Sequence, residues 1–223
     1  MLIVADQLNG WLSAVSWVIL ALILPRSLAS VGWRKLADDG LMHPYFASTV
    51  ILMVAWTLKA GVDAGLGFHF IGATLLTLMF GWRLALLAVL VALLGSYITL
   101  GGDVQAFAAN LLLKGGVPIL VSHALLRLVQ RRLPHHIFVY IFVNGFLGAA
   151  LAVLAQVAAI SLVLVMTGAY DGAYLVSDYL AFTPLMMFGE AWITGMLVAI
   201  FVSYRPELLS TFDDRSYLTD KTP

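Results

Sequence analysis

The chain has 223 residues, of which 62% are hydrophobic and only 11% are charged, and it contains no cysteine. Soluble domains are about 45–50% apolar and about 25% charged, so this composition argues against a soluble enzyme and predicts an integral membrane protein. The formal net charge is zero, which argues against a nucleic-acid partner, and a chain without cysteine cannot form disulfides or thiolate metal sites.

Seven apolar stretches predict an all-α, polytopic protein with about seven transmembrane helices, because a helix that crosses a bilayer needs about 20 mostly apolar residues. The third stretch is short, so we expect a partial span or a kink, and the sixth is long enough that we expect it to tilt. In chain order the stretches are Trp11–Leu24, Tyr45–Leu58, Phe68–Phe80, Arg83–Leu100, Val104–Val129, Phe138–Thr167 and Phe182–Tyr204.

The ends of the chain are expected to be simple. Pro25 is expected to stop the first helix. The N-terminus lacks the basic segment of a cleavable signal peptide, so we expect Met1 to stay on the mature protein. Residues 1–204 are interpreted as one membrane domain, and residues 205–223 as a short cytoplasmic tail.

The distribution of basic residues predicts the orientation. Ten of the twelve Lys and Arg residues fall on the side where the first stretch ends, which leaves Lys59 on the other side and Lys114 within a span. Because cytoplasmic loops are enriched in Lys and Arg, we expect the N-terminus outside and the C-terminus inside, in the inner (cytoplasmic) membrane. Several aspartates, Asp103 among them, fall on the outer face, where they either attract cations or simply cap helices and turns.

Two charged residues are predicted to lie at membrane depth, where charge is costly and usually paired or functional. Lys114 in the fifth stretch and Glu190 in the seventh both lie roughly 12–15 Å from the outer face. We interpret them as a buried ion pair, with a transport role for Glu190 as the alternative. Asn110 is one helical turn from Lys114 and either bonds to that pair or lines a path.

Two further patterns concern helix packing. Gly115-Gly116 followed by Pro118 predicts a break in the fifth helix near mid-membrane. The sixth stretch carries a seam of small residues that favours close packing, and Asn144 and Gln156 are expected to form hydrogen bonds to neighbouring helices there.

One histidine stands apart from the rest. His69 follows the glycine-rich segment 61–67, whose glycines permit an irregular loop that dips toward the interior and presents a side chain there. His43, His135 and His136 are expected at the inner interface, and His123 is expected in the core.

Six short motifs occur in the order Gly67-Phe68-His69-Phe70-Ile71-Gly72-Ala73, Phe80-Gly81-Trp82-Arg83-Leu84-Ala85, Gly101-Gly102-Asp103, Ala108-Ala109-Asn110, Gly189-Glu190-Ala191-Trp192-Ile193-Thr194 and Arg205-Pro206-Glu207-Leu208-Leu209. Their order and spacing, over roughly positions 60 to 209, resemble the CbiM/NikM family. These proteins are the membrane substrate-capture subunits of energy-coupling-factor transporters for cobalt and nickel.

The resemblance implies a seven-helix bundle that binds a divalent metal near its outer face through nitrogen ligands. In the family these come from the free amine and the histidine of an N-terminal Met-His, and from a loop histidine that maps onto His69. Met1 and His69 are therefore the expected ligands, and Asp103, Asn110, Lys114 and Glu190 are second-shell or pathway candidates. The chain departs from the family in having Leu2 in place of that histidine, and Leu113-Lys114 where Asn-Met is usual.

Three functions remain open at this point. The first is a permease subunit that captures a divalent cation of the cobalt or nickel class, and it requires partner subunits. The chain has no phosphate-binding G-x-x-x-x-G-K-[ST] motif, so an ATPase and a transmembrane scaffold would have to supply the energy. The second is a non-transporting accessory subunit that kept the fold. The third, an intramembrane enzyme using His69, Asp103 and Glu190, is disfavoured; we expect no enzymatic activity and no covalent cofactor.

Overall fold

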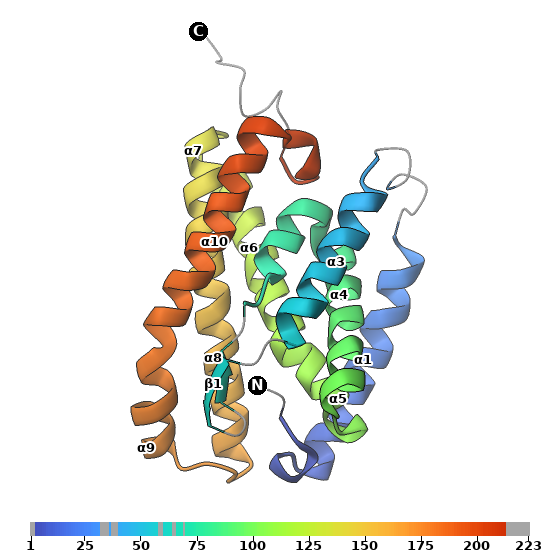
Figure 1. Cartoon of the computed structure of the whole chain (residues 1–223), viewed down its shortest axis with the longest axis vertical. Coiled ribbons are helices and arrows are strands. Elements are labelled where there is room, and N and C mark those ends of the chain that lie inside the picture. Colours follow the sequence, from blue (N-terminus) through green and yellow to red (C-terminus); the bar gives the residue numbers. More distant parts are fainter. Residues whose placement is uncertain are drawn as a thin grey trace, which may run out of the picture.

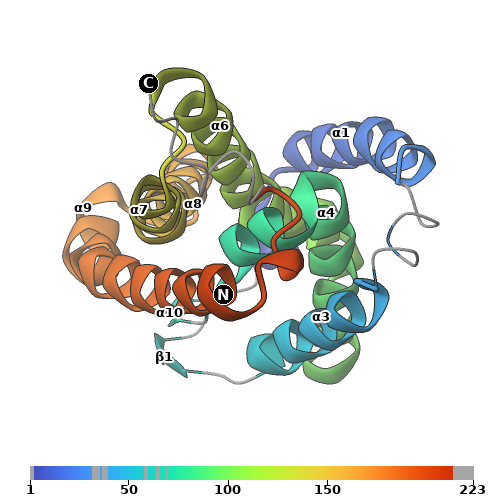
Figure 2. The same ribbon diagram turned by 90° about the horizontal axis from the view of Figure 1, so that it is seen from above.

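The structure is a computed structural model that describes residues 3–31, 36, 40–57, 60–63, 66–68 and 70–212. Long helices run alongside one another from one end of the molecule to the other (Figure 1), and viewed from above they surround a shared interior (Figure 2). The described elements are α1 (Gly10–Ala29), α3 (Met42–Thr57), α4 (Ala73–Leu100), α5 (Val104–Leu111), α6 (Val117–Arg132), α7 (Ile137–Val139), α8 (Gly148–Met166), α9 (Gly172–Tyr174) and α10 (Thr183–Tyr204), the π-helical turns η2 (Leu112–Gly116), η3 (Tyr140–Leu147) and η4 (Leu175–Tyr179), the 3-10 turns η1 (Ala5–Gln7), η5 (Leu180–Phe182) and η6 (Pro206–Leu208), and the strands β1 (Ala60–Asp63) and β2 (Leu66–Phe68).

The predicted multi-pass, helical membrane protein is confirmed. Within the described residues, five helical runs are long and apolar enough to cross a bilayer: Gly10–Ala29, Ala73–Leu100, Val104–Arg132, Ile137–Met166 and Gly172–Tyr204. Helix α3 is shorter, with 16 residues. The glycine-rich segment adds one non-helical feature, because β1 and β2 form an antiparallel hairpin in which Ala60 faces Phe68 and Gly61 faces Gly67.

Helix α4 is two helical limbs that run in opposite directions. Gly81 has φ 80° and ψ 163°, outside the helical region, and separates residues 73–80 from residues 82–100. Before it, Gly72 faces Leu52 of α3, and the Phe80 ring packs edge-on against Tyr45 at 5.2 Å. After it, Leu84 accepts a hydrogen bond from the Tyr45 hydroxyl and Gly95 faces Met53. The first limb therefore runs antiparallel to α3 and the second limb runs parallel to it, and the expected partial span is the first limb.

That first limb is about 12 Å long, less than half of the hydrocarbon thickness, so it begins deep in the bundle. Its other end is capped by the C-terminal segment of the described chain. The backbone N–H of Ser210 donates to Met79 O at 2.9 Å, and the Thr211 hydroxyl donates to Leu78 O at 2.7 Å. Leu209 and Phe212 are buried there, so the polar tail expected from residue 205 packs on the bundle as far as residue 212.

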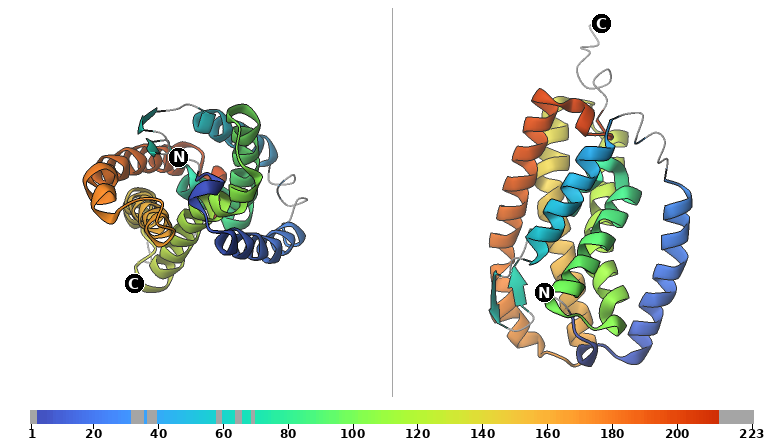
Figure 3. Two further views of the ribbon diagram at one scale, coloured as in Figure 1. Left: turned by 90° about the horizontal axis from the view of Figure 1, so that it is seen from below. Right: turned by 45° about the vertical axis from the view of Figure 1, so that its right-hand side comes forward.

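Helix α1 stands at the edge of the bundle (Figure 3), where only Leu20 and Ser27 are buried. The prediction that Pro25 stops this helix is wrong, because α1 continues to Ala29. Proline at position 25 removes only the N–H that would donate to the carbonyl of Ala21, so a single helical hydrogen bond is lost. Exposed apolar side chains of α1, among them Trp11, Val18 and Leu22, face outward, as on a lipid-facing helix.

Two predictions about polar and glycine positions also need correction. The expected break at Gly115-Gly116 is a π-helical turn, η2, which continues directly into α6, and Gly115 lies against Val89. Asn144 forms no interhelical bond, because neither atom of its amide has a partner within the described chain, and the Gln156 Oε1 atom is equally unpartnered. The small-residue seam does pack closely, with Gly145 against Gly195 and Val198.

The reversal at Gly81 generates a stability prediction. Its φ and ψ lie in a region that is nearly exclusive to glycine, where a side chain costs about 1–3 kcal/mol. Gly81→Ala should therefore lower the thermal unfolding temperature of the detergent-solubilised protein. Gly189→Ala is the matched control, because Gly189 is helical with open space beside it, and it should be neutral or stabilising. Equal effects of the two changes would contradict the strained turn.

Candidate functional site

The first described residues are inserted into the bundle. From the N-terminus the chain descends to η1 and then rises as α1 (Figure 3, right). Ile3 is buried, and Asn110 of α5 binds both of its peptide groups: Ile3 N–H donates to Asn110 Oδ1 at 2.9 Å, and Asn110 Nδ2 donates to Ile3 O at 2.8 Å. The same Nδ2 also lies 2.8 Å from the Tyr97 hydroxyl. The Asn110 amide thus bonds to the backbone of Ile3 as a neighbouring β-strand would.

The segment that follows the hairpin is bound in the interior by Glu190 of α10. Ile71 N–H donates to Glu190 Oε2 and Gly72 N–H donates to Glu190 Oε1, each at 2.8 Å. Glu190 is 5% exposed. Gly72 has φ 67°, the left-handed conformation that favours glycine, and it is the residue directly before the first limb of α4. The carboxylate therefore lies at the N-terminal end of a helix, where the helix dipole stabilises negative charge.

The same segment is held from the other side by Trp56 of α3. The indole Nε1 of Trp56 donates to Phe70 O at 3.0 Å, and Trp56 is itself buried. The ammonium group of Lys114, in η2, lies 5.4 Å from the centre of the Trp56 ring, within the range of a cation–π contact. Residues 70–72 are therefore clamped between α3 and α10.

The predicted ion pair between Lys114 and Glu190 is wrong. No salt bridge joins them, although both are described and both are buried. The sequence placed the two residues at similar depth but could not say which way each side chain points around its helix. Glu190 accepts two backbone N–H groups instead, and the ammonium group of Lys114 lies over the face of the Trp56 ring.

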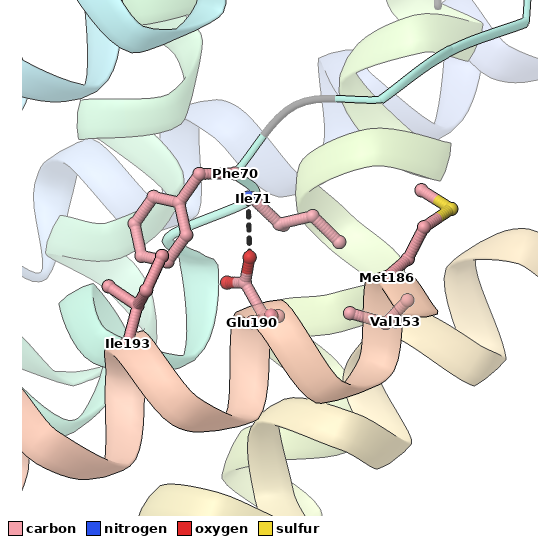
Figure 4. A pocket seen from close by; sticks show the side chains of 7 residues that line it. Phe70, Ile71, Val153, Met186, Glu190 and Ile193 are labelled. Carbon is pink, nitrogen blue, oxygen red and sulfur yellow. Dashed lines mark hydrogen bonds between the residues drawn. The ribbon is translucent and has the colours of Figure 1, made fainter. Parts of the chain in front are cut away.

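A cavity of about 230 Å³ lies beside this clamp (Figure 4). Glu190 is the charged residue in its lining, and the other walls are apolar. They are contributed by Phe70, Ile71, Val153, Met186, Gly189 and Ile193. Because Glu190 is almost fully buried, its carboxylate interacts with neighbouring groups more strongly than a carboxylate at the surface would.

The remaining predicted site residues are placed as follows. Asp103 is exposed and caps α5, where its side chain accepts the Gln105 N–H at 2.9 Å. Asp103 therefore acts as a helix cap, and its described contacts are separate from those of Glu190. Met1 and His69, the two expected metal ligands, lie outside the described residues. Each is followed closely by a residue that is bonded into the interior, namely Ile3 and Phe70.

Sequence reasoning missed Trp56. A tryptophan near the end of an apolar stretch is typical of a residue at the membrane interface, and no feature of the sequence indicated a hydrogen bond to the loop. Asn110 was identified as a polar residue of interest, but its partner Ile3 is 107 positions away and carries no polar side chain that could have signalled the contact.

Asn110→Leu should release the N-terminal segment at Ile3. The substitution leaves the N–H and C=O of Ile3 buried without partners, at about 1–3 kcal/mol for each unsatisfied group. We expect a lower unfolding temperature and, in an Ile3→Cys background, faster alkylation of the introduced thiol. Ser96→Ala is the matched control, because among the described residues the buried Ser96 hydroxyl bonds within its own helix, to Ala92 O at 3.0 Å. Unchanged alkylation in the Asn110 variant would show that Asn110 does not hold residue 3 in place.

Comparisons with known proteins identify the family and support the fold. The family model for CbiM, "Cobalt uptake substrate-specific transmembrane region", matches residues 3–208. Comparison with curated proteins found no match. A crystal structure of a transition metal transporter has a TM-score of 0.65 at 19% identity, covering 91% of this chain and 93% of its own. That of a truncated transition metal transporter has a TM-score of 0.64 at 18% identity, covering 93% and 99%. The fold is therefore shared with these two structures, and the family match, which spans nearly the whole chain, shows that the protein belongs to the CbiM family of substrate-specific transmembrane components of cobalt uptake.

Proposed function

We propose that the protein is the membrane capture subunit of an energy-coupling-factor transporter and that it takes up a divalent cation of the cobalt or nickel class. The observation that carries the proposal is the double hydrogen bond between Asn110 and Ile3, which draws the start of the chain into the bundle. A residue held in this way two positions after Met1 would allow the terminal amine to serve as a metal ligand inside the bundle.

Covalent geometry limits where the proposed ligands can be. Only Leu2 lies between Met1 and Ile3, so the terminal amine is within about 7 Å of the backbone nitrogen of Ile3, which is fixed by Asn110. His69 directly precedes Phe70, whose carbonyl is fixed by Trp56. Neutral amine and imidazole nitrogens suit cobalt and nickel, and also copper and zinc, so the ligand types alone do not select one metal.

The proposal includes partners and an orientation. The chain lacks a phosphate-binding loop of its own, so uptake would be powered by a partner ATPase through a transmembrane scaffold subunit. We further propose seven passages through the membrane, with the third made by the hairpin, residues 70–72 and the first limb of α4. With the N-terminus outside, this number places the C-terminus and most basic residues in the cytoplasm, as the charge distribution favours.

A second candidate is a non-transporting accessory subunit that kept the fold, and Lys114 favours it. Lys114 is 4% exposed and forms no salt bridge within the part of the chain that the structure describes. A buried ammonium near the proposed site repels a divalent cation, and Leu2 removes one nitrogen ligand. The two candidates differ in one measurable property, which is stoichiometric metal binding.

Metal binding tests the proposal directly. Purified protein with an unextended N-terminus should bind one Co²⁺ or Ni²⁺ per chain, measured by calorimetry and by elemental analysis after gel filtration. His69→Ala should abolish stoichiometric binding. Affinity should also fall as the pH is lowered through about 6–7, because an imidazole binds metal only when it is deprotonated.

His43→Ala is the matched control, because His43 is exposed at the start of α3, and it should bind metal as the wild-type protein does. A second variant with two residues added before Met1 should lose affinity if the terminal amine is a ligand. Wild-type protein that takes up no cobalt, nickel, copper or zinc would refute metal capture and favour the accessory subunit.

The orientation has its own test, for which the cysteine-free chain is a ready background. A cysteine in place of Asp171, the exposed N-cap of α9, should react with a membrane-impermeant maleimide added outside intact cells. A cysteine in place of Arg131, exposed at the end of α6, should react only after the cells are opened. The reverse labelling pattern would contradict the proposed topology.

A further inference from the structure

We propose that Glu190 is the positioning residue of the capture site: its carboxylate fixes residues 70–72, and hence the adjacent ligand loop, without binding the metal itself. This inference rests on the proposed function for its consequence in metal binding. Its structural part, the control of residues 70–72, stands on described contacts alone.

The first argument is the match between donors and acceptors. Ile71 and Gly72 present two successive N–H groups, and each donates to a different oxygen of one carboxylate at 2.8 Å. Two parallel bonds fix both the distance and the rotation of this peptide segment relative to α10, which one bond would not do. A glutamine at this position could accept only one of the two, because its amide nitrogen would face the other N–H.

The second argument concerns the location of the charge. A carboxylate at membrane depth costs several kcal/mol unless specific groups stabilise it. Here no basic side chain forms a salt bridge with Glu190 within the described residues, so the two N–H groups and the adjacent helix end supply the stabilisation. Its preferred partner is therefore the backbone, and both oxygens are already engaged there.

The third argument is that residues 70–72 depend on side chains for their order. Irregular backbone is tolerated at membrane depth only where protein satisfies its polar groups. Phe70 O is bound by Trp56, and the N–H groups of residues 71 and 72 are bound by Glu190. Phe70 and Ile71 also line the cavity beside Glu190, so there is space into which the segment could move once the clamp is removed (Figure 4).

The variants separate the possible roles. Glu190→Gln keeps the shape and removes one acceptor, whereas Glu190→Asp keeps both oxygens on a shorter stem. Met186→Leu is the matched control, because Met186 lines the same cavity on the same helix and makes no described hydrogen bond to residues 70–72. Unfolding temperatures of all four proteins are measured first, and the other assays are run at a temperature at which all four are folded.

The first readout needs no metal. Hydrogen–deuterium exchange of the peptide that contains Ile71 and Gly72 should be faster in Glu190→Gln than in wild type, and intermediate in Glu190→Asp. Exchange in α8 should be unchanged, which distinguishes local release from general loosening. Equal exchange in wild type and Glu190→Gln would overturn the proposal, whatever metal binding shows.

The second readout is Co²⁺ binding. Loss of a residue that orients a metal ligand typically lowers affinity about 10–100-fold, and we expect this range for Glu190→Gln with Met186→Leu unchanged. At saturating Co²⁺ the visible spectrum of Glu190→Gln should match that of wild type, because the ligand set is intact. A changed spectrum would show that Glu190 is a ligand, and an unchanged affinity would show that the clamp does not serve capture; either result overturns the proposal. If wild type binds no metal, the proposed function fails and the positioning role in capture fails with it, while the exchange experiment still reports whether the clamp exists.

Discussion

Backbone groups in a bilayer have no water to bind, and the interior of this protein is organised around that constraint. Two stretches of chain enter the bundle without helical hydrogen bonds: the N-terminal segment at Ile3 and the segment 70–72. Each is satisfied by side chains from distant helices, by Asn110 in one case and by Glu190 with Trp56 in the other. The helices can therefore be seen as the frame that makes two irregular segments possible.

This arrangement explains how charge is distributed in the interior. Glu190 and Lys114 are both buried, yet each is stabilised by a dipole or a ring and not by the other. A direct ion pair would have tied α10 to η2. The observed contacts instead tie α10 and α3 to the same loop, and η2 to the ring of Trp56. Glu190 bonds to residues 70–72 directly, and Lys114 lies against Trp56, which bonds to the same residues. These residues directly follow His69, the predicted ligand.

Composition and hydropathy were sufficient to predict the membrane class, the long apolar helices and a short helix before Gly81, because these depend on local apolar content. The Lys114–Glu190 pair and the bonding role of Asn144 could not be predicted correctly, because they depend on the rotation of each helix about its axis. Likewise, a proline inside a helical pattern often ends the helix, but α1 continues past Pro25. Asn110 bonds to the backbone of Ile3, and backbone groups are the same at nearly every residue. The sequence therefore could not indicate that Ile3 is its partner.

The short first limb of α4 has a mechanical consequence. Its one end begins at Gly72, next to the carboxylate of Glu190, and its other end is joined to the C-terminal segment through Ser210 and Thr211. A helix of about two turns is stiff along its axis and is flanked here by glycine at both ends, Gly72 and Gly81, each with a positive φ. It therefore forms a rigid link of about 12 Å, which fixes the separation between the C-terminal segment at one end and residues 70–72 at the other.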